Sequence, residues 1–519
     1  MKKRFNTTGV CVSRKHYMVD ITNKINKIKE LIDNEFYFTI NRPRQFGKTT
    51  TINEIENFLK DTYLIISLSF EGLGDIIFND ERLFSKKFIE LMADSIEFED
   101  IKSANNLMIL GTNVENLSDL SKVITKYIKT LDKDVLLIID EVDKSSNNQL
   151  FLSFLGMLRN KYLLRDKGKD VTFKSVILAG VHDVKTLKIK IREGEEVKLN
   201  SPWNIAVNFK VDMSFDSDEI ETMLIEYCEE NNIEMDTKLL SDKLYYYTSG
   251  YPFLVSRICQ IIDEDILDKS SHWDIAMIDL ALKRLLRESN TLFDDLFKNM
   301  ENNNDLNEFI FSIIFNGEII QFNRDNPLIY LANLYGIIKN EKNNCMLSNR
   351  VFEQRIYNYF SSKLETKTKN IASYNFKDNF LLTNGGLDMK LVLIKFQQFM
   401  KEQYSSKDIK FLEKNGRTLF LAFLKPIING VGFDFKEVQI SQEQRLDIVV
   451  TYNNFKYIIE LKLWYGQSYH EKGINQLDNY LDIHGVNDGY LIIFNFKDNK
   501  EYKTENISVN GKDIFAVYL

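Results

Sequence analysis

Two carboxylates and a lysine stand close together near the C-terminus, on a segment whose pattern predicts a β-hairpin. Apolar runs at 446–452 and 457–461 flank an Asn-Asn pair at 453–454, which is typical of a hairpin turn. Twelve residues separate Asp447 from Glu460. A turn midway between them lets the two carboxylates converge.

Successive side chains of a strand point to opposite faces, so Glu460 and Lys462 share one face and Leu461 takes the other. Carboxylate oxygens are the ligands that Mg²⁺ prefers, and bound Mg²⁺ polarises a phosphodiester and acidifies a bound water. We therefore expect Asp447 and Glu460 to be catalytic ligands of Mg²⁺, with Mn²⁺ as a substitute. Lys462 is expected to orient the water or to neutralise charge on the phosphate. The same spacing also fits a charged edge on a surface hairpin.

The segments 445–447 (Arg-Leu-Asp) and 458–462 (Ile-Ile-Glu-Leu-Lys) resemble the PD-(D/E)XK nuclease superfamily, over roughly the last quarter of the chain. Leu446 stands where the family name has proline. The resemblance implies metal-dependent hydrolysis of nucleic acid phosphodiesters. It also implies that Gln476, on the helix after the hairpin, faces the site, and that Glu413 is the acid that precedes the core strands.

The order of the predicted elements is also that of the superfamily core. The elements are a helix over 392–416, the hairpin, the strand with the Glu-x-Lys pair, a helix around 476–480 and an apolar strand over 489–494.

Aromatic and histidine side chains follow the Glu-x-Lys strand. Trp464 and Tyr469 either stack nucleic acid bases or belong to the core or its rim. His470 and His484 are expected at the surface or as helix caps rather than as metal ligands.

A strand, a loop and a helix near the N-terminus form the pattern of a phosphate-binding loop, with the strand over 37–41, the loop over 42–49 and the helix over 50–59. Backbone N–H groups and the dipole at a helix start favour phosphate, so Lys48 is expected at the β and γ phosphates and Thr49 at Mg²⁺. The candidate nucleotide-binding residues of this segment are Arg42, Arg44, Gln45, Phe46, Gly47, Lys48, Thr49 and Thr50.

A continuous apolar run at 135–139 is typical of a strand that is buried on both faces of a parallel sheet, and it ends in two acids. Asp140 is expected to hold Mg²⁺, and Glu141 to activate the water that attacks the γ phosphate of ATP. Another apolar strand over 175–179 leads to the His-Asp pair at 182–183, which could sense the γ phosphate.

The runs 9–12, 16–20 and 38–49 resemble the AAA-like ATPases of bacteria, whose phosphate-binding loops carry Arg-Pro-Arg in place of a leading glycine. The resemblance implies that ATP binds here, and such ATPases are often joined to a C-terminal PD-(D/E)XK domain. Residues 250–252 (Gly-Tyr-Pro) are similar to the Gly-x-Pro of signal-transducing (STAND-type) ATPases. That similarity implies a helical lid with Pro252 near the adenine.

Three arginines are candidate nucleotide ligands. Arg42 replaces the first glycine of the generic phosphate-binding pattern. Arg44 is either a phosphate ligand or part of a salt bridge in the loop. Arg257 is either a sensor arginine that contacts phosphate or an ordinary arginine on the lid surface.

These patterns predict an α/β chain: a P-loop NTPase with a parallel sheet, a helical lid and a winged-helix module, followed by an α/β nuclease-like domain. The winged-helix module either clamps the nucleotide domain or reads DNA, and its few basic residues favour the clamp. The expected domains are the ATPase at 1–215, the lid at 216–268, the winged-helix-like module at 269–364, a linker at 365–390 and the nuclease-like domain at 391–519.

Composition restricts partners and compartment. The formal net charge is −8, so nucleic acid binding would need a local basic groove. Four cysteines without a CxxC pair argue against structural zinc and against a secreted disulfide scaffold. No apolar stretch approaches the roughly 18 residues of a spanning helix, and the N-terminus lacks a signal-peptide core. We expect a cytoplasmic chain without a membrane partner.

The leading functional hypothesis is an ATP-gated, Mg²⁺-dependent nuclease that acts on nucleic acid, with DNA as the expected substrate. A homo-oligomer or a nucleotide-dependent assembly is expected. The resemblance implies a role in phage defence or in mobile-element conflict. The alternative is a STAND-like signalling or scaffold ATPase whose C-terminal domain binds nucleic acid or protein without cleaving.

Overall fold

The structure is a computed structural model of the 519-residue chain. The residues that it describes are 2–142, 148–181, 202–267, 272–316, 320–367, 380–403, 416–417, 419–421, 423–424, 427, 432–437, 447–452, 455–464, 466–495 and 501–519. The chain divides into two compact units: the first consists of Met1–Leu296 with Leu331–Ile337, and the second of Phe297–Tyr330 with Ile338–Leu519. The domain boundaries expected from the sequence stay predictions.

The first unit contains a four-stranded parallel sheet with the strand order β1-β4-β3-β2. All residues of β3 and β4 are buried, as their continuous apolar runs predicted. The parallel sheet expected for the N-terminal part is therefore confirmed. The strands are β1 (Phe38–Asn41), β2 (Leu64–Ser69), β3 (Val135–Asp140) and β4 (Ser175–Gly180).

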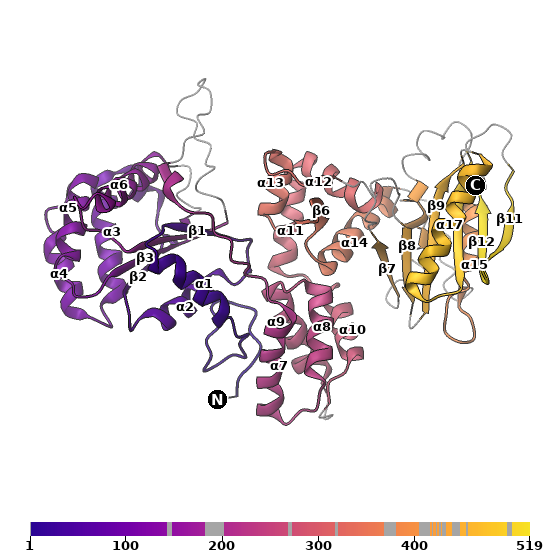
Figure 1. Cartoon of the computed structure of the whole chain (residues 1–519), viewed down its shortest axis with the longest axis horizontal. Helices are drawn as coiled ribbons and strands as arrows, with labels where there is room; N and C mark the ends of the chain where they lie inside the picture. The colour runs from indigo at the N-terminus through magenta and orange to yellow at the C-terminus, as the bar shows by residue number, and fades with distance from the viewer. Residues whose placement is uncertain are drawn as a thin grey trace, which may run out of the picture. The chain divides into compact units, whose positions relative to one another are not determined.

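Helices cover both faces of this sheet (Figure 1). Leu136 and Ile138 of β3 pack into the layer on one face, and Leu137 and Ile139 pack into the layer on the other. The helices of the first layer are α1 (Thr22–Asp33) and α2 (Lys48–Leu59). The helices of the second are α3 (Glu81–Ile96), α4 (Ile101–Gly111), α5 (Leu117–Ile128) and α6 (Gln149–Asp166).

Helices follow the sheet along the chain, as predicted for 216–268. Asp216 caps the first of them, and Glu219 completes the capping box. These helices are α7 (Ser217–Asn231), α8 (Thr237–Thr248), α9 (Pro252–Ile261), α10 (Ile275–Leu285) and α11 (Thr291–Glu301). Short 3₁₀ or π turns lie at Asp75–Asn79, Pro202–Ile205, Ile262–Ile266 and Ser312–Asn316.

The two helices and the hairpin predicted within 269–364 are present, although the name winged helix stays a prediction. Among the described residues, no helix combines the length and the apolar character needed to cross a membrane. The elements are α12 (Asn304–Phe311), α13 (Pro327–Leu334), β5 (Ile338–Glu341), β6 (Asn344–Leu347) and a further helix, α14 (Arg350–Lys367).

The second unit contains a six-stranded sheet with the order β11-β12-β10-β9-β8-β7. The predicted hairpin forms as the antiparallel pair β8 and β9, and β9 pairs in parallel with β10. The prediction did not include β7, β11 or β12. The strands are β7 (Gly432–Glu437), β8 (Asp447–Tyr452), β9 (Phe455–Leu463), β10 (Asp488–Phe494), β11 (Thr504–Val509) and β12 (Lys512–Tyr518).

Two helices pack on this sheet. Helix α17 (Gln467–His484) lies against the face that carries Ile458 and Leu491, in front of the sheet in Figure 1. Helix α15 (Met389–Gln403) contacts β10 and β12. The helix predicted over 392–416 is described only as far as the end of α15, so Glu413 lies outside the described residues.

A buried ion pair ties α6 to the segment before β4. Lys161 is 1% exposed and donates to Asp170 at 2.7 Å and to the Thr125 hydroxyl at 2.6 Å. Burial acts to raise the pKa of Asp170, but the hydrogen bonds from Lys161 and Thr125 outweigh it and leave that pKa below its usual value. Removal of either charge would leave the other buried without its partner.

We expect Asp170→Asn to lower the free energy of unfolding by roughly 3 kcal/mol, because it leaves the Lys161 ammonium buried without a counter-charge. The folded pKa of Asp170 lies below its unfolded value of 3.8, so the stabilisation is complete above that pH and is lost as the pH falls through the folded pKa. Calorimetric unfolding between about pH 3 and 7 measures this loss. Asp166→Asn, which removes a half-exposed partner of Arg165, should change stability little. Equal effects of the two variants would contradict the assignment.

Candidate functional site

The loop between β1 and α2 has the geometry of a phosphate cradle. Gly47 caps α2 with a φ of 77°, a backbone conformation that glycine adopts without strain. A Cβ atom at Gly47 would lie 3.7 Å from Pro252, so the proline that begins α9 lies against the loop. The structure therefore brings Pro252 to the phosphate-binding loop, next to the position predicted for the nucleotide.

Lys48 and Thr49 begin α2 and make the contacts that suit a nucleotide site. The Lys48 ammonium donates to the backbone oxygens of Arg42 and Pro43, both at 3.0 Å. The Thr49 hydroxyl donates to Asp140 Oδ2 at 3.1 Å, at the carboxyl end of β3. Neutral carbonyls hold the ammonium, and phosphate oxygens can replace them because they form stronger, charge-assisted hydrogen bonds.

Glu141, which directly follows β3, has an unusual backbone conformation. Glu141 has a φ of 55°, and its N–H donates to Asp140 Oδ1 at 2.8 Å. Asp140 thus accepts hydrogen bonds at both oxygens, from Thr49 and from Glu141. The His-Asp pair at 182–183 lies outside the described residues.

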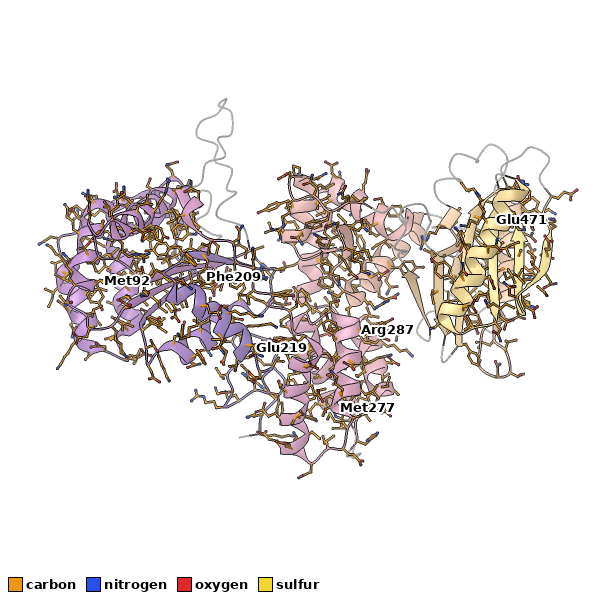
Figure 2. All side chains as sticks on the ribbon, viewed as in Figure 1. Met92, Phe209, Glu219, Met277, Arg287 and Glu471 are labelled. Carbon is orange, nitrogen blue, oxygen red and sulfur yellow. The ribbon has the colours of Figure 1, made fainter. Side chains whose placement is uncertain are left out.

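Arg42 makes protein contacts beside β1. Its guanidinium donates to Val211 O at 2.6 Å and to Asn41 O at 2.8 Å, and it lies 5.4 Å from the centre of the Phe209 ring. Phe209, labelled in Figure 2, stacks on Phe38 of β1. Arg42 therefore ties the loop to the segment that follows the sheet, and its role as a nucleotide ligand stays a prediction.

The other two candidate arginines form ion pairs. Arg44 is exposed and pairs with Asp295 of α11 at 3.2 Å. Arg257 of α9 donates to both carboxylate oxygens of Glu288, at distances between 2.7 and 3.1 Å. These contacts correspond to the salt-bridge alternative for Arg44 and to the lid alternative for Arg257.

Residues beyond the sheet also hold the loop. The Gln45 amide donates to the Thr291 hydroxyl of α11 at 2.7 Å. The Tyr251 hydroxyl donates to Arg44 O at 2.6 Å, and the Phe46 ring meets the Tyr251 ring edge to face. The loop is thus fastened by the residue before α9 and by the start of α11.

A cavity of about 350 Å³ adjoins the loop, which is within the size range of small-molecule sites. Sequence reasoning missed that the N-terminal segment forms one wall of it. Cys11 N donates to the Thr50 hydroxyl at 3.2 Å, and the Thr7 hydroxyl donates to Gln260 of α9 at 3.0 Å, so the segment is fixed between α2 and α9. Lining residues include Thr8, Gly9, Phe46, Thr50, Pro252 and Phe253.

The position of Gly250 explains the Gly-x-Pro pattern. Gly250 has a φ of 70°, and a Cβ atom there would lie 1.7 Å from the carbonyl oxygen of Phe215. Phe215 N donates to Gly250 O at 2.9 Å. The glycine lets the chain that leaves the sheet pass close to the start of α9, where Pro252 meets the phosphate-binding loop.

The second site lies on β9 and α17. The Lys462 ammonium lies 2.5 Å from Glu460 Oε1 and donates to Gln476 Oε1 at 2.5 Å. Glu460 and Lys462 are both buried, and Glu460 Oε2 is buried without a hydrogen-bond partner among the described residues. The structure thus brings together three of the predicted catalytic residues.

The strand register extends this cluster. Ile448 pairs with Ile459, so the next position places Asp447 opposite Glu460. Glu437 of β7 in turn pairs with Asp447, which adds an acid that sequence reasoning missed because β7 was not predicted. Among the side chains that the structure describes, no group of three His, Cys, Asp or Glu residues is placed to hold a metal ion, and the side chains of Asp447 and Glu437 are not in that set.

A buried carboxylate oxygen without a donor suits a hard cation, because the cation satisfies an acceptor that would otherwise remain unpaired. Glu460 Oε2 is such an oxygen. With Asp447 at the opposite position of β8, the ligand set would consist of carboxylate oxygens. The residues present are therefore chemically suited to Mg²⁺ or Mn²⁺.

Trp464 and His470, which follow β9, pack against the core of the second unit. His470 is buried, with Nε2 3.4 Å from the Tyr518 hydroxyl, and Trp464 packs against both rings. Burial lowers the pKa of His470. The expectation that His470 lies at the surface was wrong, because α17 turns it toward the sheet. The side chains of Tyr469 and His484 are outside the described set.

Comparison with known families agrees with both of the domain types expected from the sequence. A family model described as an AAA-like domain matches residues 9–362, and one described as the PD-(D/E)XK nuclease superfamily matches residues 429–505. The chain belongs to the AAA-like domain family, and its C-terminal part is a PD-(D/E)XK superfamily domain. Both resemblances noted in the sequence are confirmed, and the STAND-type subclass stays a prediction.

The solved structures that are similar to this chain include three proteins with low sequence identity to it. The Walker-type ATPase PABY2304 of Pyrococcus abyssi is 13% identical, with a TM-score of 0.47 over 68% of this chain and 99% of the other. ORC2 of Aeropyrum pernix is 12% identical, with a TM-score of 0.37 over 70% and 99%. The RuvB Holliday junction branch migration motor of Thermotoga maritima is 13% identical, with a TM-score of 0.33 over 64% and 94%. None of the curated proteins compared matches the chain.

We expect Gly250→Ala to lower the free energy of unfolding by at least about 3 kcal/mol and to weaken ATP binding, because the added methyl group meets a backbone oxygen. Thermal unfolding and the binding of a fluorescent ATP analogue measure the two effects. Gly168→Ala is the matched control: Gly168 has a φ of 66° but open space around its Cβ position, so only about 1 kcal/mol should be lost. Similar losses in both variants would show that crowding at Phe215 is unimportant.

Proposed function

We propose that the chain is an ATP-regulated, metal-dependent nuclease. The observation that carries the proposal is the state of Glu460: one oxygen contacts the Lys462 ammonium and the other is buried without a donor among the described residues. An unpaired buried acceptor costs roughly 1–3 kcal/mol, so a purely structural ion pair would be expected to satisfy both oxygens. The functional explanation for the unpaired Glu460 Oε2 is that this oxygen binds a cation.

Each residue of the C-terminal site has a task in this proposal. Asp447 and Glu460 would hold Mg²⁺ or Mn²⁺, which when bound would polarise the phosphodiester and acidify a water. Lys462 places a positive charge beside the reacting phosphate, where it offsets charge that develops in the transition state. Gln476 keeps the ammonium in place through its 2.5 Å hydrogen bond. Glu413 is proposed as a further acid.

The N-terminal site is proposed to bind and hydrolyse ATP. Lys48 would exchange its two loop carbonyls for phosphate oxygens, and Thr49 with Asp140 would hold Mg²⁺. Glu141 would orient the attacking water. The cavity beside the loop would receive the nucleoside, with Pro252 in its wall.

The proposed substrate is nucleic acid, with DNA favoured. Because the chain carries a formal net charge of −8, binding would depend on local basic groups and should weaken steeply with salt. The proposed setting is defence against phage or conflict between mobile elements, and assembly into a homo-oligomer is part of the same hypothesis.

One observation favours the alternative of a signalling or scaffold ATPase. The Lys462 ammonium contacts Glu460, so a side chain of the protein already neutralises one of the acids. A C-terminal domain that only binds nucleic acid or protein could retain this pair as a structural ion pair. A cleavage assay separates the two functions.

We expect Lys462→Ala to reduce cleavage of plasmid DNA in Mg²⁺ or Mn²⁺ by at least about 100-fold, because one preorganised charge is lost from the transition state. Lys456→Ala removes an exposed lysine from the same strand and should retain most of the activity. Gel assays of plasmid and single-stranded DNA measure both variants. Absence of cleavage by the wild type, with and without ATP, would favour the scaffold alternative.

We expect Lys48→Ala to weaken ATP binding by at least about 100-fold, because the ammonium is the cation that this loop pattern offers to the phosphates. Its DNA cleavage should then become independent of ATP. Lys60→Ala, at the opposite end of α2, is the control and should bind ATP and respond to it normally. If Lys48→Ala loses ATP binding but cleaves with unchanged ATP dependence, the two sites are not coupled.

A further inference from the structure

Helix α17 carries a glycine in its interior. Gly473 is buried and lies well inside the range Gln467–His484, away from both ends of the helix. Glycine lowers the stability of a helix interior relative to alanine, because it gains the most backbone freedom on unfolding. A glycine at such a position suggests that a side chain there would conflict with a neighbour.

The neighbour of Gly473 is the stem of Lys462. A Cβ atom at position 473 would lie 3.3 Å from both Cγ and Cε of Lys462, and 3.7 Å from its Cδ. Carbon atoms pack at about 3.5–4.0 Å, so an added methyl group would press on the stem at two points. The lysine therefore passes the helix where the helix has no side chain.

Lys462 has little freedom to yield to such pressure. Its backbone pairs with Ile493 of β10, and its ammonium is held by Glu460 Oε1 and Gln476 Oε1, each at 2.5 Å. A push on Cγ and Cε is therefore transmitted to the ammonium. The shift needed is a few tenths of an ångström, and a preorganised charge stabilises the transition state less when it is displaced.

We propose that Gly473 is a positioning residue for Lys462: the absence of a side chain lets the lysine stem cross α17, so that its ammonium meets Glu460 and Gln476. The effect on cleavage rests on the proposed nuclease function, whereas the conflict between a methyl group at 473 and the lysine stem does not. The two parts can be measured separately.

Hydrogen exchange of α17 amides in the full-length chain measures the conflict. We compare Gly473→Ala in three backgrounds: the wild type, Lys462→Ala, which removes the stem, and Lys462→Met, which keeps an unbranched stem without the charge. With the stem removed, the alanine should slow exchange about fivefold through its helix propensity. With lysine or methionine at 462, the gain should be much smaller. An equal gain in all three backgrounds overturns the proposal.

Cleavage of plasmid DNA measures the functional part. Gly473→Ala should reduce the turnover rate by about 3- to 10-fold while the affinity for DNA stays unchanged, because a displaced ammonium affects the transition state more than binding. It should cause no additional loss in the Lys462→Ala background. Asn475→Ala, an exposed helix-favouring change on α17, is the control and should retain activity. Equal losses from Gly473→Ala with and without Lys462 would refute its action through the lysine.

The two measurements distinguish the possible failures. If the wild type does not cleave DNA but the exchange gain depends on the Lys462 stem, the proposed function fails and the packing role of Gly473 stands. If cleavage occurs and Gly473→Ala leaves its rate unchanged, the positioning role fails and the nuclease function stands.

Discussion

The C-terminal site depends on the burial of opposite charges side by side on one strand. Glu460 and Lys462 leave water together, and each would be strongly unfavourable alone. The ammonium has two acceptors, but among the described residues the carboxylate has one donor and one bare oxygen. The neighbouring helix must therefore supply an acceptor, Gln476, and also leave space, at Gly473. The residues at these two positions of α17 are thus explained by the ion pair beneath the helix.

The N-terminal site holds Lys48 and Thr49 through two different kinds of acceptor. Lys48 donates to two backbone carbonyls, and Thr49 donates to one oxygen of Asp140, the carboxylate that is proposed to hold Mg²⁺ with it. The side chains of Arg42 and Gln45 instead bond to neighbouring segments, at Val211 and Thr291. Two side chains of the loop thus contact neighbouring segments, while the proposed phosphate ligand Lys48 contacts the backbone of the loop itself.

Much of this organisation could be predicted because it follows from periodicity. The apolar runs of β3 and β4 and the alternation along β9 determine which residues are buried and which share a face, and hence where Asp140 and Glu460 lie.

Side-chain direction outside regular elements does not follow from a pattern. Arg42 was predicted as a ligand from its position in the loop, and the pattern did not indicate that its guanidinium contacts Val211 and Phe209. Two features of the sites were missed because they depend on long-range contacts rather than on a periodic sequence pattern. The N-terminal wall of the cavity is placed by long-range hydrogen bonds such as that of Cys11 to Thr50, and Glu437 could not be recognised before β7 was known to pair with β8.

The pairing of β8 with β9 also limits how the length of this chain can change during evolution. One residue inserted into either strand between Asp447 and the turn, or between the turn and Glu460, would invert the facing of every position beyond it. An insertion of two residues would leave each side chain on its original face of the sheet. A change of length that is confined to the turn and keeps the strand pairing would do the same. Insertions and deletions within these two strands are therefore expected in even steps, whereas loops elsewhere can drift in length one residue at a time.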